Sequence, residues 1–293
     1  MSRTSGTVAS VPRRVVAYAM RDARKRAGKT VTESAAIAGL AQGTLTKYEK
    51  AENPFPKAIV YRLADYYGMD SDARDQLVEL AGRKALGWWQ NNQQIPAWFA
   101  SYVAFEYEAG LILTFEDGVI PGLLQTPEYA RALLGADLRA GTPEEITAQV
   151  DVRIQRQARL AAEEPLHLHV VLGEAALHRP GGDAQTMRDQ LAILIEWSAR
   201  DNIDLRVLPF DAGVHTSSET AFTLMRFPSP LQGVKVRDVC YIEYKLGAVY
   251  LEEEAATEFS EVHENLRQQA LDPAESVHLI QRVMDERYMR SDA

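Results

Sequence analysis

Between positions 42 and 50, four side chains and one glycine are suited to close contact with the edges of DNA bases. If this stretch is helical, at about 100° per residue, one of its sides carries Gln42, Gly43, Thr46, Lys47 and Lys50. Gln pairs bidentately with adenine and Lys with guanine, while the Thr methyl group contacts that of thymine. The glycine would let the backbone approach the groove wall. The pattern therefore predicts a DNA-reading face.

The other side of the same stretch has the small and apolar residues that a helix-turn-helix requires. Gly39 would occupy the turn, because glycine adopts a left-handed backbone without steric cost. Ala35, four positions earlier, allows two helices to approach closely, and Leu45, six positions later, faces the first of them. We expect these three residues and Tyr48 to form the core of a helix-turn-helix. The alternative is a helical hairpin with a purely structural role.

Basic residues elsewhere in the first 62 positions are candidates for contacts with DNA phosphates, which fix register without reading sequence. The candidates are Arg13, Arg14, Arg21, Lys29, Lys57 and Arg62. For each of them a solvated surface position is the alternative. Glu49 is expected to pair with an arginine of the first helix rather than to contact a base.

The elements that would position these residues are five short helices. VVAYAMRDARKRAG has apolar residues at helical spacing, and TESAAIA, with Thr32 as its cap, precedes QGTLTKYEKAE. PKAIVYRLADYYG and SDARDQLVELAGRK follow, the second with Ser71 as its cap. The sequence thus predicts an all-α, five-helix domain over residues 13–84, after a flexible arm at residues 1–12.

Residues 85–98 are predicted to link two domains. Gly87, Pro96 and an Asn/Gln cluster interrupt any regular pattern, although the stretch is too apolar for a free tether. Aromatic residues of the linker and of the segment after it could line a ligand pocket or pack at an interface, and packing is the simpler account. They are Trp88, Trp89, Trp98, Phe99 and Tyr102.

Residues 99–293 combine strand and helix patterns. Six segments rich in β-branched or aromatic residues lie between turn signals: ILTFE, LHLHVVLG, IDLRVLPF, AFTLMRF, DVCYIEY and AVYLE. Helices are expected at WFASYVAFEYEA, 127–134, 143–162, 184–200, EAATEFSEVHENLRQQAL and AESVHLIQRVMDERY. Three of the last four strands come nearly in succession, which favours an α+β domain with a mixed, partly antiparallel sheet. We expect it to have a regulatory and dimerisation role.

Charge is distributed unevenly along the 293 residues. Positions 1–90 hold 15 Lys+Arg against 9 Asp+Glu, and the remainder holds 17 against 32. The chain thus has a basic head, residues 1–90, and an acidic remainder. This distribution is consistent with nucleic-acid contact, because salt screens the acidic residues that lie far from the basic ones. The single cysteine, Cys240, excludes an internal disulfide. With neither a signal peptide nor an apolar run of membrane-spanning length, we expect a cytoplasmic protein without membrane contact.

Catalytic and cofactor signatures are missing from the sequence. It contains no P-loop, dinucleotide fingerprint or nucleophile elbow. His167 and His169 on one strand face, with Glu174 and His178 on a helix face, would make a conceivable metal site. Such a histidine pair more often has a packing role, and His215 is expected in a loop. We therefore predict no enzyme, no cofactor and no metal.

Residues 14–84, and GLAQGTLTKYEKAENP in particular, resemble the XRE (Cro/repressor-like) helix-turn-helix domain. Members often have Ser where this chain has Ala41, so a capping contact is missing unless Gln42 supplies it. From Trp88 onward the chain resembles the C-terminal domain of actinobacterial XRE regulators of the WhiJ-like type. PGLLQTPEYARALL is the most specific piece, in which Thr126 can cap a helix that starts at Pro127.

The resemblance implies a transcriptional regulatory or antitoxin-like role, often beside a small acidic partner protein. Together with the basic head, it predicts a sequence-specific regulator that binds double-stranded DNA. We expect a homodimer on a roughly palindromic operator, with the C-terminal domain sensing a small molecule or a protein. The alternative is an antitoxin-like or adaptor protein that mainly binds the acidic partner, with DNA binding limited to autoregulation.

Overall fold

The computed structural model describes residues 9–83, 87–92, 95, 97–138, 140–229, 236–245 and 247–289. These residues divide into two compact units. The first comprises the described residues of Met1–Asn91, Ala97–Glu108 and Phe227–Arg237, and the second comprises the remainder. The division differs from the expected boundary near residue 98, since the helix before the first strand groups with the N-terminal helices.

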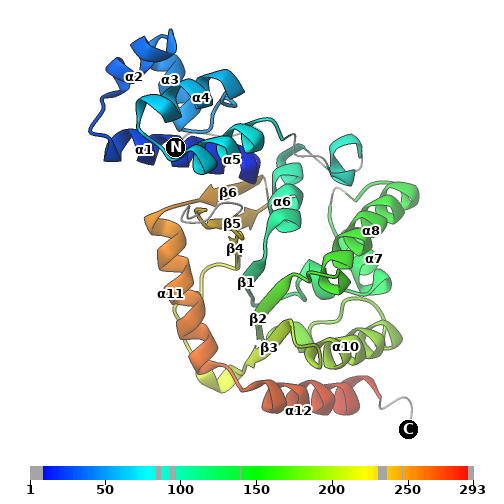
Figure 1. Ribbon diagram of the computed structural model, residues 1–293. Helices are drawn as coiled ribbons and strands as arrows, with labels where there is room; N and C mark the ends of the chain where they lie inside the picture. The colour runs from blue at the N-terminus through cyan, green and yellow to red at the C-terminus, as the bar shows by residue number, and fades with distance from the viewer. Residues whose placement is uncertain are drawn as a thin grey trace. The chain divides into compact units, whose positions relative to one another are not determined.

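The first unit contains the five expected helices (Figure 1). They are α1 (Val11–Arg26), α2 (Val31–Ala38), α3 (Gln42–Glu49), α4 (Lys57–Tyr66) and α5 (Ser71–Ala81). Helix α1 includes the last two residues of the expected arm, because Pro12 lies in its first turn, where a missing N–H costs nothing. Of the expected linker, Trp88–Asn91 form the 3-10 helix η1, and helix α6 (Ala97–Glu108) follows.

Two of the expected helix caps are corrected. The cap of α2 is Thr30, whose hydroxyl accepts a hydrogen bond from Glu33 N at 3.2 Å while Thr30 N donates to Glu33 Oε2 at 2.8 Å. This reciprocal capping box satisfies two N–H groups that the predicted cap Thr32 would not. The cap of α5 is Asp70, so Ser71 is the first helical residue rather than the cap.

The second unit is built on a mixed sheet of the six expected strands. They are β1 (Leu111–Glu116), β2 (His167–Gly173), β3 (Ile203–Leu208), β4 (Phe222–Arg226), β5 (Val239–Tyr244) and β6 (Gly247–Leu251). Their order is β3-β2-β1-β4-β5-β6, with the β1–β2 and β2–β3 pairs parallel and the other three antiparallel. The prediction of an α+β domain with a mixed, partly antiparallel sheet is confirmed.

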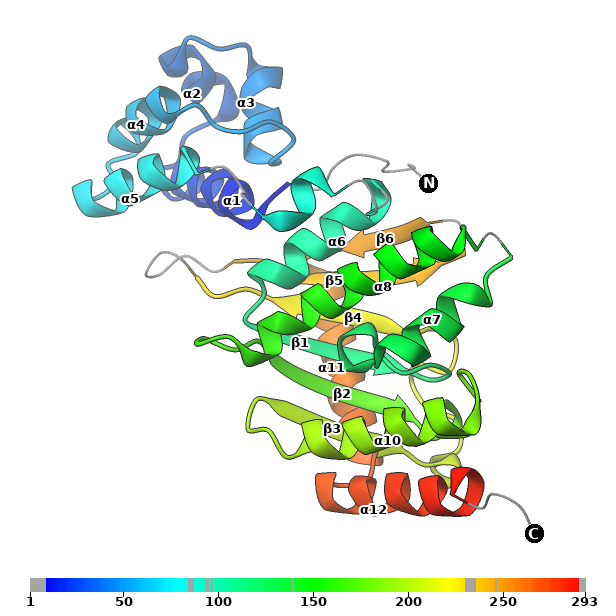
Figure 2. The ribbon, with the colours of Figure 1, turned by 90° about the vertical axis from the view of Figure 1, so that its right-hand side faces the viewer.

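Helices cover both faces of this sheet. They are α7 (Pro127–Gly135), α8 (Pro143–Gln157), α9 (Ala175–His178), α10 (Ala184–Ser198), α11 (Glu254–Gln269) and α12 (Pro273–Val283), with a π-helical turn at Met284–Tyr288. Figures 1 and 2 show α7, α8 and α10 on one face and α11 on the other. Under α11 lies an apolar cluster that includes Phe115, Leu224 and Cys240. No helix in the described part of the chain is both long enough and apolar enough to cross a membrane.

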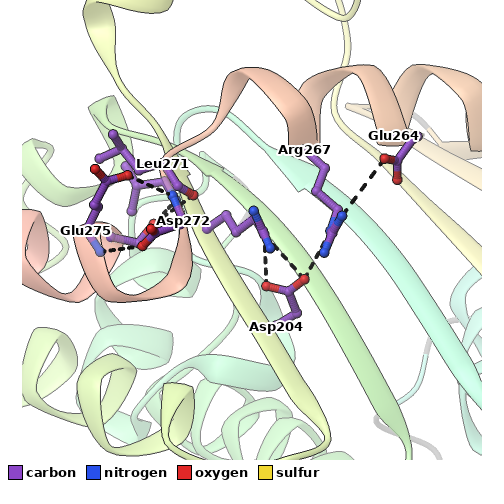
Figure 3. A network of polar contacts seen from close by, with 9 residues as sticks. Asp204, Glu264, Arg267, Leu271, Asp272 and Glu275 are labelled. Atoms are coloured by element: carbon purple, nitrogen blue, oxygen red, sulfur yellow. Dashed lines mark hydrogen bonds and ion pairs between the residues drawn. The ribbon is translucent and has the colours of Figure 1, made fainter.

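The edge strand β3 is covered by the end of the chain. Val207 N donates to Ser276 Oγ at 2.9 Å, and Leu271 N donates to Val207 O at 2.9 Å. On the α11 face, Asp204 accepts hydrogen bonds from Arg206 Nε at 3.0 Å and Arg267 Nε at 3.1 Å (Figure 3). These contacts fasten α11 and α12 to β3 and occupy both backbone hydrogen-bonding groups of Val207 at its edge.

The PGLLQTPEYARALL segment has a structural role. Thr126 caps α7 by accepting a hydrogen bond from Tyr129 N at 3.2 Å, as expected, and Pro127 begins the helix. Gln190 of α10 is fully buried and holds the loop before this helix, because its amide accepts from Thr126 N and donates to Leu124 O, each at 2.7 Å. The motif therefore packs α7 against α10.

Candidate nucleic-acid interface

The turn between α2 and α3 is built around a left-handed glycine. Gly39 has φ 68° and ψ 34°, a conformation that residues with a side chain rarely adopt. Leu40 N donates to Ala35 O at 2.9 Å and closes the end of α2. Ala35 is 2% exposed and Leu45 is fully buried between the two helices, while the ring of Tyr48 contacts that of Phe55. The two helices thus form a helix-turn-helix with a small, closed core.

The outward side of α3 carries the polar residues expected to contact bases. Gln42, Gly43, Lys47 and Lys50 are exposed. Thr46 is half-buried, and its hydroxyl donates to Gln42 O at 3.0 Å. Within the described part of the chain, the ammonium groups of Lys47 and Lys50 have no ion pair or hydrogen bond. Their charges are therefore available to a partner outside this chain.

The N-terminus of α3 has no side-chain cap. Ala41 occupies the cap position with φ −69° and ψ 145°, and no side chain caps the helix there. Gln42 does not take over this role, because Thr32 Oγ1 donates to its Oε1 at 3.2 Å. A Cβ at Gly43 would meet no atom within 4 Å, so packing inside this chain does not require a glycine there. The first turn of α3 thus presents its backbone and the carboxamide of Gln42 to solvent.

A buried ion pair fixes α3 against α1. Arg24 Nε and Nη2 donate to the two carboxylate oxygens of Glu49 at 2.7 and 2.8 Å, and Arg24 Nη1 donates to Lys29 O at 2.9 Å. The two residues are 8% and 4% exposed. Hydrogen bonding to Glu49 raises the pKa of Arg24. The expected pairing of Glu49 with a first-helix arginine is confirmed, and it fixes the orientation of the outward side of α3.

Two of the candidate phosphate ligands, Lys57 and Arg62, are exposed on α4. The guanidinium of Arg62 lies 4.0 Å from the position that a Cβ on Gly39 would occupy, so it is beside the turn. The stem of Lys57 covers Gly82, where a Cβ would come within 2.0 Å of Lys57 Cε. Both cations lie on the surface of the helix-turn-helix domain itself.

Three other candidates are half-buried and contact the protein's own rings or apolar surface. The guanidinium of Arg21 lies 5.4 Å from the ring centre of Tyr18, and Lys29 Nζ lies 5.0 Å from that of Tyr66. Burial lowers the pKa of Arg13. These side chains are therefore partly engaged inside the chain rather than fully solvated.

Arg14 is not available to a phosphate, and its prediction is corrected. It is 1% exposed, and its guanidinium carbon lies 5.8, 5.2 and 5.6 Å from the ring centres of Tyr18, Phe105 and Phe227. Its Nη2 donates to Arg237 O at 3.2 Å. No signal near position 14 could have revealed this, because most of these partners are distant in the sequence.

The aromatic residues around the expected linker pack against one another. Trp89 is 5% exposed and contacts Trp88 edge-on and Tyr107 at a ring distance of 4.7 Å. Phe99 and Tyr102 stack at 5.0 Å. Trp98 belongs to α6, but its side chain lies outside the described residues. The contacts favour interior packing over a ligand pocket for the described rings.

The remaining reactive residues do not converge. Cys240 is fully buried, which raises the pKa of its thiol to about 12 and keeps it protonated. His178 Nε2 lies 3.3 Å from Glu174 Oε1, and the register of β1 and β2 places His167 and His169 on the α11 face. Among the described residues, no three His, Cys, Asp or Glu side chains are grouped to hold a metal ion.

Comparison with protein families matches two regions of the sequence. A model described as "Helix-turn-helix domain" matches residues 17–77, and one described as "Domain of unknown function (DUF5753)" matches residues 99–282. No curated protein and no solved structure matches the chain. The helix-turn-helix match and the exposed side of α3 together indicate DNA binding.

Proposed function

We propose that this chain, which belongs to the DUF5753 family and carries a helix-turn-helix domain at residues 17–77, is a sequence-specific transcriptional regulator of the XRE type. The observation that carries the proposal is the outward side of α3. Gln42, Lys47 and Lys50 are exposed there, on a helix that a buried ion pair holds in a fixed orientation. A helix in a fixed orientation, with solvent-side lysines that form no ion pair with a described residue, suits major-groove reading.

Each residue of this side has a distinct part in the proposed contact. The carboxamide of Gln42, held by Thr32, would pair with adenine, and the lysines would contact guanine. The open first turn of α3 and Gly43 would let the backbone approach the groove. Lys57 and Arg62 would contact phosphates and fix the register of the domain on the duplex.

The second unit would supply dimerisation and receive a signal. A single helix-turn-helix seldom binds tightly, so we propose a homodimer on a roughly palindromic operator, with half-sites about one helical turn apart. The signal would be a small molecule or a protein, and the resemblance to the WhiJ-like regulators leaves its identity open. The chain would act through binding rather than through catalysis.

The proposal is tested by selecting genomic fragments with the purified full chain at a fixed salt concentration. The parent should enrich a common sequence, whereas a Lys47→Ala, Lys50→Ala double variant should enrich none. The control is Lys25→Ala with Arg26→Ala, which removes two exposed charges from α1 and should enrich the parent's sequence. Equal enrichment by the parent and the α3 variant would show that α3 does not read bases.

A chain that enriches no sequence, but co-purifies with a small acidic protein, would favour the adaptor or antitoxin-like alternative. Titrating that protein into the DNA-binding assay would then show whether it releases or promotes binding. Salt dependence adds a second check, because each lost phosphate contact should reduce the slope of log affinity against log salt by about one.

A further inference from the structure

We propose that Thr46 and Gly43 form a recess on the outward side of α3 that takes the C5-methyl group of a pyrimidine base. The inference rests on the proposed function, because it assigns a further part of the contact between α3 and the major groove. At one operator position the protein would distinguish a methylated pyrimidine, thymine or 5-methylcytosine, from an unmethylated one, uracil or cytosine.

The hydroxyl of Thr46 is engaged inside its own helix. Its Oγ1 donates to Gln42 O, one turn earlier, at 3.0 Å. A threonine has a single O–H to donate, so while this bond holds, Thr46 has no proton for the O4 atom of thymine. The carboxylate of Glu49, one turn later, is bound to Arg24 and does not compete for that proton. Since thymine presents O4 and the C5-methyl group in the major groove, the attractive contact left to Thr46 is between two methyl groups.

The space on the N-terminal side of Thr46 is open. Side chains of a helix lean toward its N-terminus, so that of Thr46 lies over the turn that contains Gly43. Gly43 is exposed, and a Cβ there would meet no other part of the chain within 4 Å. The half-buried Thr46 therefore borders a recess with the size of the methyl group that an alanine at position 43 would place there.

The neighbours of this recess on the outward side are longer and polar. Gln42, Lys47 and Lys50 are exposed and end in hydrogen-bond donors. Among the five outward residues, only Thr46 carries a methyl group. Its side chain is short, so a base must come close to the helix backbone to reach it, and Gly43 allows that approach. The recess therefore adds an apolar contact between polar ones.

A methyl group that leaves water on binding adds a modest and measurable gain. Burial of one such group changes an affinity by about fourfold. Because no proton of Thr46 is shared with the base, the gain should be the same for thymine and for 5-methylcytosine, which differ at C4 and share the C5-methyl group. Methylation of a cytosine at this position would thus strengthen binding.

The experiment uses the full-length protein and the operator that the parent selects. Each thymine of one half-site is replaced in turn by uracil, which removes only the methyl group, and affinities are measured at one salt concentration. At one thymine the loss should be about fourfold. That base pair is then changed to C·G, with and without a methyl group on the cytosine. The methylated duplex should bind about fourfold more tightly than the unmethylated one.

Two variants of Thr46 separate its methyl group from its hydroxyl. Thr46→Ser keeps the hydroxyl and loses the methyl group, so it should bind the thymine and uracil duplexes equally. Thr46→Val keeps a methyl group and loses the hydroxyl, so it should retain the difference of about fourfold. The matched control is Thr44→Ser, which removes the methyl group of a threonine about 200° around the helix and should also retain the difference.

The outcomes separate this inference from the proposed function. It is overturned if Thr46→Ser still distinguishes thymine from uracil, or if Thr46→Val no longer does, since the hydroxyl would then be the reader. Equal affinities for the two cytosine duplexes would show that recognition needs O4 of thymine, which also overturns it. If the parent selects an operator in which no thymine responds to loss of its methyl group, the recess is wrong and the proposed function stands. A parent that selects no operator overturns both.

Discussion

The cations of α1 and those of α3 show that position, not charge, decides what a basic residue does. Arg14 and Arg24 are 1% and 8% exposed and have partners within the first unit. Lys47 and Lys50 are exposed, and neither forms an ion pair with a described residue. All four lie within the basic first 90 residues. The buried arginines Arg14 and Arg24 stabilise the first unit, whereas the exposed lysines Lys47 and Lys50 are available to DNA.

The two groups should respond differently to substitution. Removing one partner of a buried ion pair leaves an uncompensated charge in a poorly solvated site, which costs more free energy than the pair itself contributes. Removing an exposed cation leaves water in its place and changes the stability little. Stability and DNA affinity therefore report separately on the two regions.

The largest expected effect is that of Arg24→Ala. It leaves the Glu49 carboxylate buried without its partner, so we expect the free energy of unfolding of the first unit to fall by about 3 to 5 kcal/mol. Urea unfolding followed by amide hydrogen exchange in α1 and α3 measures this loss. Arg26→Ala, on the exposed side of α1, should change stability by less than about 0.5 kcal/mol. If Arg24→Ala lowered the unfolding free energy as little as Arg26→Ala, the buried ion pair would not be more important for stability than an exposed cation.

His263 extends the contrast to a buried ionisable group of the second unit. It lies on α11, is 2% exposed, and burial is the main cause that lowers its pKa to about 4. In the unfolded chain a histidine titrates near pH 6.5, so between about pH 6.5 and 4 the unfolded state binds more protons. Stability should therefore fall as the pH falls through this window, by about 3 kcal/mol in total.

Replacing His263 tests this pH dependence. His263→Phe removes the titrating group, so its unfolding free energy should depend less on pH between about 6.5 and 4 than that of the parent. Denaturant unfolding at several pH values provides the measurement. His278, exposed on α12, gives the control variant His278→Phe, which should keep the slope of the parent. An equally steep slope in His263→Phe would assign the pH dependence to other groups.

Local signals accounted for much of what the sequence could predict. The Gly39 turn, the six strands and the pairing of Glu49 each depend on residues close in sequence or on simple periodicity. The predicted caps of α2 and α5 are wrong because each helix start offers more than one capping residue, Thr30 and Thr32 for α2 and Asp70 and Ser71 for α5. Only the backbone geometry distinguishes between them.

Long-range packing accounted for what the sequence could not predict. Arg14 has the spacing of an outward-facing cation, and its burial depends on aromatic residues that follow more than 90 positions later. In the same way, the strand patterns gave the six segments but not their order, in which β4 pairs with β1 rather than with β3. Tertiary contacts override local preference at such positions.

Substitutions on the exposed side of α3 should have the opposite effect to Arg24→Ala, because they should change DNA affinity and leave stability nearly unchanged. Lys47→Ala should weaken binding to the selected DNA by about 1 to 3 kcal/mol and relax the preference at one base pair. The unfolding free energy should stay within about 0.5 kcal/mol of the parent. Affinities for the operator and for single-base variants measure the effect, with Lys25→Ala as the control. An equal loss on every sequence would assign Lys47 to a phosphate instead of a base.

The smallest expected effect is a gain in stability from Ala41→Ser. Ala41 has the extended backbone of a capping residue and is exposed, so a serine hydroxyl there can accept a hydrogen bond from the first turn of α3. We expect about 0.5 to 1 kcal/mol more stability, because serine replaces alanine at a cap. Thermal unfolding measures this gain, and Ala36→Ser, at an exposed position inside α2, controls for the added hydroxyl. If the gain appears while affinity for the selected DNA falls, DNA itself uses the open N–H groups of α3. If affinity is unchanged, those groups face water, and base reading depends on the side chains alone.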